Sequence, residues 1–174
     1  MREIGIVSYK PKIYIGTDHA GFVMKEKLIP YIEKLGYEVI DFGNFKYDDT
    51  DDYIDFVSPV AKAVALNPED NRGIILGGSG QGEAIVANRF PNIRAIVYYG
   101  EAGFFPEADI IKLGREHNNS NILSLGARFL NIETAQKVVK KWLETKFTNE
   151  ERHIRRIKKI ETVSRDVKNN LEFK

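Results

Sequence analysis

The chain has 174 residues, of which 43% are hydrophobic and 29% charged, a balance typical of a soluble globular domain with a sizeable core. Its 26 basic and 25 acidic side chains leave a net charge of +1, so composition gives no reason to expect nucleic acid or membrane as a partner. The absence of cysteine excludes disulfides, thiolate nucleophiles and cysteine metal sites. Without a signal-peptide pattern or an apolar run that could span a bilayer, we expect a cytoplasmic protein.

Short β-rich segments alternate with helical patterns along the chain. In order, the predicted elements are a strand at 12–16, a helix at 22–35, a strand at 37–42, a helix at 54–65, a strand at 73–76, a helix at 83–89, strands at 95–99 and 121–125, and a helix at 133–146. This alternation predicts an α/β fold, a doubly wound, Rossmann-like αβα sandwich with a five-stranded parallel sheet. We expect one domain over residues 1–174, with its core at about 12–148 and a helical tail at about 149–174.

The predicted tail is basic and also carries an apolar stripe. Its cations include Arg152 and Arg156, which are four residues apart and would share one face of a helix. Two guanidinium groups on one face suit a phosphate, although a solvated basic helix fits this feature equally well. Because Ile154, Ile157 and Ile160 recur along the same segment, we expect the tail to pack on something, such as a second subunit.

A glycine-rich loop, GGSGQG at 77–82, joins a predicted strand to a predicted helix. It is not the dinucleotide fingerprint, because Glu83 stands where a third glycine is needed, and no P-loop lysine follows. Glycines at 78, 80 and 82 would let backbone N–H groups approach an anion, and Ser79 adds a hydroxyl. The alternative is a tight turn that only needs positive φ.

The three histidines each have a polar neighbour. The pairs are Asp18-His19, His117-Asn118 and Arg152-His153. Histidine titrates near neutrality and can act as an acid or a base, but each pair alone also fits a structural histidine.

Five separated segments together resemble one known family. They are GTDHAGF (16–22), DDYIDF (51–56), GGSGQGEAIVANR (77–89), REHNNSNILSLGAR (115–128) and RHIRRIKKI (152–160). They are similar to the B-type ribose-5-phosphate isomerases, a family that also includes galactose-6-phosphate isomerase subunits. The resemblance covers about residues 12–162. It implies the same sandwich fold and a homodimer or homotetramer with a shared active site. Because the three histidines are scattered among different motifs, with no HxH or HExxH pair, we expect no metal, and we expect no other cofactor.

The resemblance also implies a reaction. An aldose phosphate is opened, deprotonated at C2, held as an enediolate and reprotonated at C1. Many members use a loop cysteine as the base, whose place here is Gly78 or nearby. A subgroup with the pattern GGSG-x-GE uses a glutamate, which makes Glu83 the expected base. In the family, the loop holds the enediolate oxygen, a role that falls here on Ser79, Gly80 and Gly82, with Gly78 and Gln81 completing the substrate-binding loop.

The remaining roles are carried over in the same way. The phosphate is expected to contact His19, Arg128, Arg152 and Arg156. His117 matches the acid that opens the sugar ring, and Asn118 matches a residue that contacts the sugar or the enediolate. Asp18 matches a residue that binds sugar hydroxyls and assists ring opening, and Tyr53 matches a residue that lines the site. The basic tail would reach across a dimer, so that the two tail arginines serve the neighbouring subunit.

Three departures leave the substrate open. Ile54 replaces a proline, residues 99–114 form a longer segment than in relatives, and an N-terminal extension precedes the first strand. We expect interconversion of ribose 5-phosphate and ribulose 5-phosphate. The alternatives are a tetrose or hexose phosphate, or a non-catalytic sugar-phosphate-binding subunit or sensor. A flavodoxin-like nucleotide module is disfavoured because neither phosphate-loop pattern fits.

Overall fold

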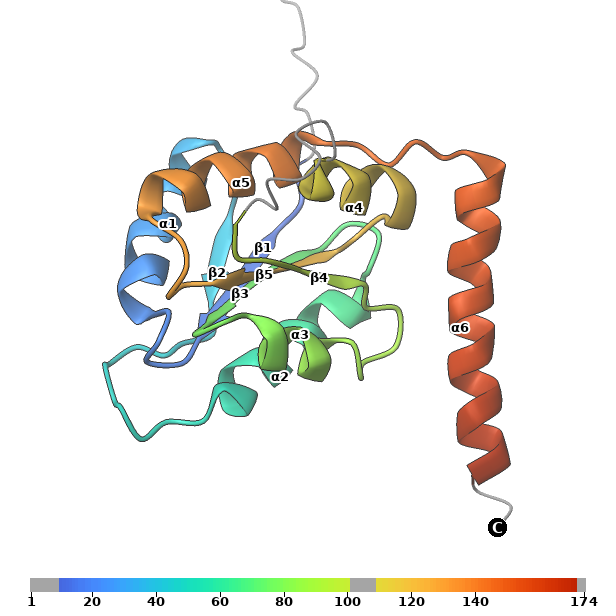
Figure 1. Cartoon of the computed structure of the whole chain (residues 1–174), viewed down its shortest axis with the longest axis horizontal. Coiled ribbons are helices and arrows are strands. Elements are labelled where there is room, and N and C mark those ends of the chain that lie inside the picture. Colours follow the sequence, from blue (N-terminus) through green and yellow to red (C-terminus); the bar gives the residue numbers. More distant parts are fainter. Residues whose placement is uncertain (1–9, 101–108, 172–174) are drawn as a thin grey trace, which may run out of the picture.

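The computed structural model describes residues 10–100 and 109–171 of the chain, with side chains described as far as residue 163. A parallel sheet lies between two layers of helices (Figure 1). The strands are β1 (Ile13–Thr17), β2 (Val39–Asp41), β3 (Arg72–Gly77), β4 (Ala95–Tyr98) and β5 (Ile122–Gly126). The helices are α1 (Phe22–Lys34), α2 (Tyr53–Leu66), α3 (Gln81–Ala87), α4 (Ile110–Asn118), α5 (Ile132–Glu144) and α6 (Glu151–Leu171).

The strand order β2-β1-β3-β5-β4, with every pair parallel, confirms the predicted doubly wound sandwich. Thr17 pairs with Leu76, and Gly77 pairs with Gly126, so β1, β3 and β5 end together at one edge of the sheet. We call this the carboxyl edge, and the opposite one the amino edge. In sheets of this kind, ligands bind beyond the carboxyl ends of the strands, near the point where the strand order reverses.

The sheet is covered on both faces because its strands are nearly all apolar. Helices α1, α4 and α5 lie on one face and α2 and α3 on the other (Figure 1). On the first face, Trp142 is fully buried among the side chains of the sheet. On the second, Val57, Val60 and Val64 of α2 are fully buried, as their spacing predicts.

Helix α4 was not among the predicted elements. It begins after Asp109, whose carboxylate accepts a hydrogen bond from the backbone N–H of Lys112 (3.0 Å). The helix has a glycine at its centre, a residue that normally disfavours helix. A side-chain carbon on that glycine, Gly114, would lie 2.6 Å from Cδ1 of Ile96, so close packing on β4 requires glycine there. Most of the longer segment before α4, and the N-terminal extension, lie outside the described residues.

Helix α6 stands beside the sandwich rather than on it (Figure 1). Its root is attached through Thr148, whose N–H and hydroxyl both donate to the carbonyl of Glu116, at 3.2 and 2.9 Å. Ile154 and Ile157 are half-buried near this root, whereas Ile160 is 50% exposed. None of the described helices is both long and apolar enough to cross a bilayer.

Candidate active site

The glycine loop turns sharply at the carboxyl edge. Gly80 has φ +77°, a left-handed conformation that favours glycine, and the Ser124 hydroxyl donates to its carbonyl (2.6 Å). The Ser79 hydroxyl accepts a hydrogen bond from the N–H of Gln81 (3.3 Å). Within residues 10–100 and 109–171, no carbonyl accepts from the backbone N–H groups of Ser79 and Gly80. The turn therefore needs its glycine, and it also leaves N–H donors for an anion.

Glu83 lies in the first turn of α3, with only 5% of the residue exposed. Its carboxylate folds back over Gly77. A side-chain carbon on Gly77 would lie 1.6 Å from Oε1 of Glu83 and 2.1 Å from its Cδ. Burial raises the pKa of the Glu83 carboxyl, and the negative charge of Asp18 raises it further, while the backbone N–H of Glu83 opposes them. The result is a desolvated carboxylate beside the loop's N–H groups, which suits a general base.

Two further predicted residues lie at the same edge of the sheet as this carboxylate. Asp18 directly follows β1 and is buried, and it accepts a hydrogen bond from the N–H of Ala20 (3.0 Å). Burial raises the pKa of the Asp18 carboxyl as well. Tyr53 begins α2, and its ring lies 3.0 Å from where a side-chain carbon on Gly82 would be. The tyrosine thus lies against the glycine loop, and its expected role in lining the substrate site stays a prediction.

An arginine and a histidine lie at the same edge. Arg128 follows β5, donates its backbone N–H to the carbonyl of Gly78 (3.2 Å), and has an exposed side chain. A hydrogen bond between Nδ1 of His19 and the Asp51 carboxylate (2.6 Å) raises the pKa of His19. Desolvation of the ring and the nearby charge of Arg128 lower this pKa by less, so that it is raised overall.

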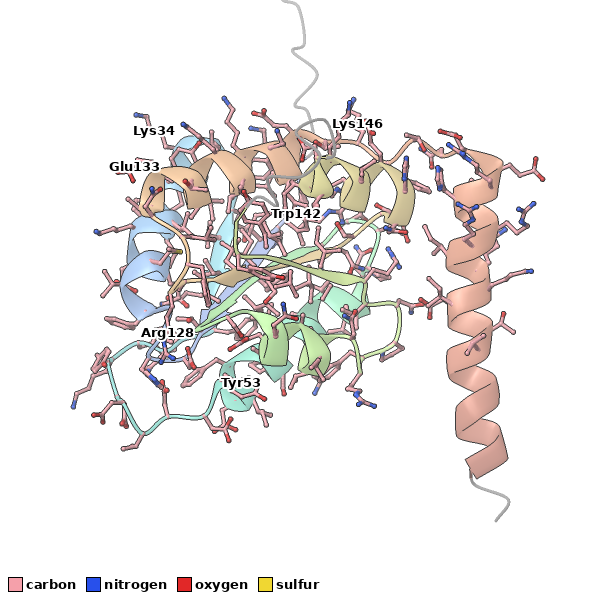
Figure 2. All side chains as sticks on the ribbon, viewed as in Figure 1. Lys34, Tyr53, Arg128, Glu133, Trp142 and Lys146 are labelled. Atoms are coloured by element: carbon pink, nitrogen blue, oxygen red, sulfur yellow. The ribbon has the colours of Figure 1, made fainter. Side chains whose placement is uncertain are left out.

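We call these residues the carboxyl-edge cluster: Asp18, His19, Tyr53, Gly78, Ser79, Gly80, Gln81, Gly82, Glu83 and Arg128. The structure brings all of them to one end of the sheet. In Figure 2, Tyr53 and Arg128 lie on the side of the sandwich away from α6.

The other four predicted site residues lie elsewhere. His117 and Asn118 end α4, just before β5 begins, and Arg152 and Arg156 lie on the first turns of α6. We call these four the amino-edge cluster. Strand β5, of five residues, runs from this edge to the other and spans roughly 16 Å. A single chain therefore does not place His117 or the tail arginines beside Glu83.

The amino-edge cluster is organised by a pair of histidines. The rings of His117 and His153 stack with centroids 4.3 Å apart and an interplanar angle of 11°. His153 is buried, and burial lowers its pKa, with the charges of His117 and Arg152 adding to the effect. A neutral His153 can thus fix the ring of His117, which stays half-buried at the surface.

One group of residues has the donor set of a metal site. Among the described residues, only Asp18, His19 and Asp51 offer three ligand atoms, all within 4.8 Å of one another. The hydrogen bond between His19 and Asp51 already accounts for the closeness of two of them. The expectation that no metal takes part stays a prediction.

Sequence reasoning missed Asp51 and Gly77. Asp51 was part of a polar, acidic segment between two elements, and nothing in the spacing separates it from its acidic neighbours. For Gly77, the signal was a glycine at the end of an apolar strand, before the loop proper. The need for glycine at position 77 becomes visible only in the structure, where the Glu83 carboxylate folds back over this residue.

A buried carboxylate beside free N–H donors, with an arginine and a histidine at the same edge of a doubly wound sheet, defines the site of an enzyme for a small anionic substrate. Residues 13–160 match the family model described as Ribose/Galactose Isomerase, and the chain belongs to this family. The resemblance found in the sequence is thereby confirmed.

Individual relatives agree with this assignment. The chain is 37% identical over 146 residues to ribose-5-phosphate isomerase B of Mycolicibacterium paratuberculosis, covering 84% of this chain and 87% of the relative. It is 36% identical to the Escherichia coli protein of the same name, covering 87% and 95%. The crystal structure of ribose-5-phosphate isomerase B from Mycoplasma genitalium with bound ribulose-5-phosphate has a TM-score of 0.81 at 31% identity, covering 88% and 96%.

Proposed function

We propose that this protein interconverts ribose 5-phosphate and ribulose 5-phosphate through an enediolate. The observation that carries the proposal is the buried Glu83 carboxylate, folded over Gly77 beside the unpaired N–H groups of the loop. The names of the relatives support the choice of substrate.

In this proposal, Glu83 takes the proton from C2 of the open aldose and returns it to C1. The proton of the C2 hydroxyl passes to the C1 oxygen in the same conversion, so that the carbonyl moves from C1 to C2. The negative charge that develops on the substrate oxygen is stabilised by the N–H groups of Ser79 and Gly80, with Gly82 next in the loop. Asp18 and Tyr53 contact the sugar hydroxyls.

The position of Gly77 agrees with the choice of a glutamate base. A side chain at 77 would occupy the place of the Glu83 carboxylate, whereas a side-chain carbon at 78 would face the Arg128 guanidinium, 3.3 Å away. We therefore place the loop base of cysteine-dependent relatives at the position of Gly77 rather than Gly78. A cysteine and a glutamate would then deliver their basic atoms to the same point from different positions in the loop.

We further propose that the site is completed by a second subunit. The amino-edge cluster is a strand length away from Glu83 in its own chain, so His117 and Asn118, as well as Arg152 and Arg156, would serve the partner's carboxyl-edge cluster. His117 would open the sugar ring as an acid. Arg152 and Arg156 would hold the phosphate together with His19 and Arg128. Docking of α6 on the partner would also cover the exposed half of Ile160, which would be worth about 1 kcal/mol.

The first experiment is a panel of tetrose, pentose and hexose phosphates, followed by ketose formation. Fastest turnover of ribose 5-phosphate is the expected result. If another sugar phosphate is turned over faster, that compound is the substrate in place of ribose 5-phosphate. If the protein binds sugar phosphates and turns over none of them, a sensor or a non-catalytic subunit is favoured.

The second experiment tests the shared site. Glu83→Gln and Arg156→Ala are each expected to be nearly inactive, and then to recover part of the activity when mixed under conditions that exchange subunits. In a mixed dimer, one site has both wild-type residues. If exchange is verified by mass and no activity returns, Arg156 does not serve a partner's site.

A further inference from the structure

We propose that Asp51 is a positioning residue that holds the His19 imidazole for the substrate phosphate. This inference rests on the proposed function for the role of His19, and its geometry is independent of that role. Oδ1 of Asp51 accepts two hydrogen bonds from His19, one from ring Nδ1 (2.6 Å) and one from the backbone N–H (3.1 Å). The Asp51 side chain is only 8% exposed, so water competes little for these bonds.

Asp51 is itself held in place from behind. Its second oxygen, Oδ2, accepts a hydrogen bond from Nδ2 of the buried Asn44 (2.6 Å). The backbone N–H of Asn44 donates to the carbonyl of Thr17 at the end of β1 (2.8 Å). The His19 ring is therefore linked to the strand that carries it by two routes, through its own backbone and through Asn44 and Asp51. Such a closed network fixes the ring before a ligand arrives.

The bond to Nδ1 also decides which atom of the ring faces a ligand. With Nδ1–H donated to a carboxylate, Nε2 remains for the substrate, and the negative charge favours a proton on both nitrogens. The other charged groups near the ring divide in sign: Asp18 and the exposed Asp48 also favour the imidazolium, and Arg128 opposes it. Tyr47 meets the ring edge-on, at 6.3 Å and 79°, and adds contact without charge. A protonated Nε2 is a hydrogen-bond donor to a phosphate oxygen.

The loop that carries Asp51 offers a matched control. Asp49 lies two residues earlier, is exposed, and makes no hydrogen bond or ion pair within the described parts of the chain. Asp51→Ala and Asp49→Ala remove the same charge from the same loop. Asp51→Asn removes the charge and keeps an oxygen that can accept from His19. These three variants separate contact, charge and general loop effects.

The test measures kcat and KM for ribose 5-phosphate and the inhibition constant of inorganic phosphate, with thermal melting to verify folding. For Asp51→Ala we expect KM and the inhibition constant to rise together by about 10- to 100-fold, with kcat within about threefold of the wild type. Asp49→Ala should match the wild type. For Asp51→Asn, the loss of phosphate affinity relative to wild type should be greater at pH 8 than at pH 6, because the imidazole loses its proton at a lower pH without its carboxylate partner than with it.

Unchanged KM and phosphate inhibition in Asp51→Ala would overturn the proposal, as would a fall in kcat at constant KM, which would place Asp51 in the chemistry. If Asp51→Ala does not fold, the pH dependence of Asp51→Asn decides alone, and a ratio to wild type that does not change with pH overturns the proposal. Should the wild type fail to isomerise ribose 5-phosphate, the proposed function is wrong. Calorimetric titration of inorganic phosphate into the same variants then still tests Asp51.

Discussion

Replacing Gly77 with alanine tests the position of the Glu83 carboxylate directly. The new Cβ would lie 1.6 Å from Oε1 of Glu83, whereas side-chain carbons essentially never approach another atom closer than 3.0 Å. The carboxylate must therefore move by at least about 1.4 Å, the difference between these two distances. Gly77 is not in the left-handed region of φ, so alanine brings no backbone strain.

This displacement should remove activity without removing the fold. A misplacement of about 1 Å can cost a reaction roughly 100-fold, which corresponds to about 2.7 kcal/mol in the activation free energy. The moving atoms are the end of a flexible side chain, so we expect the free energy of unfolding to change by less than about 1 kcal/mol. The assay is the initial rate of ketose formation from ribose 5-phosphate, paired with urea unfolding.

Gly73, earlier in the same strand, provides the control. A Cβ there would lie 2.9 Å from Ile122 and 3.0 Å from Val60, inside the core. Gly73→Ala should cost about 1–3 kcal/mol of stability by overpacking, with kcat of the folded protein near the wild-type value. Wild-type kcat in Gly77→Ala would refute the reasoning, because the Glu83 carboxylate could not then be acting from the place described.

Four further outcomes are expected. Burial raises the pKa of the Glu83 carboxyl above its ordinary value of 4.5, and the base must be ionised to act. We therefore expect kcat/KM to fall with decreasing pH before pH 4.5 is reached. A kcat/KM that stays constant down to pH 4.5 would contradict the assignment of Glu83 as the base. His117→Ala should lower turnover of ribose 5-phosphate by about 100-fold or more. The variant should still exchange the C1 hydrogen of ribulose 5-phosphate in D2O, observed by NMR, because that exchange needs only the base. Loss of this exchange would give His117 another role. Activity should survive EDTA, because the carboxylate and the loop N–H groups supply the base and the anion site; an activity lost on chelation and restored by a divalent ion would show a metal requirement. Ser120→Ala should lower the free energy of unfolding by about 1–3 kcal/mol, because the Trp142 indole N–H donates to the Ser120 hydroxyl (2.9 Å) and is buried; an unchanged urea midpoint would mean that the indole finds another acceptor.

The contrast between α2 and α4 shows where prediction from sequence works. In α2, buried valines recur at helical spacing, so burial and periodicity give the same answer. In α4, Gly114 interrupts the pattern, and the reason for it lies on another element, Ile96 of β4. Local spacing carries no information about a contact of this kind.

The site divides in the same way. The glycine loop and its neighbouring carboxylate could be found from the sequence, because Ser79, Gly80 and Glu83 are neighbours along the chain. The contact between His19 and Asp51 joins residues 32 positions apart, from two different loops. Their meeting depends on β1 and α2 being packed side by side, which fixes the ends of both loops.

The sequence by itself determined the class of fold and the family. The alternating apolar segments and the five family motifs can be recognised from it because each consists of residues that are neighbours along the chain. Only the tertiary structure decided which predicted residues meet. The parallel register carries Asp18, Glu83 and Arg128 to one edge of the sheet and leaves His117 at the other, because each crossover returns the chain to the amino edge before the next strand begins. Side chains that follow strands are thereby gathered, and those that precede them are kept a strand length away.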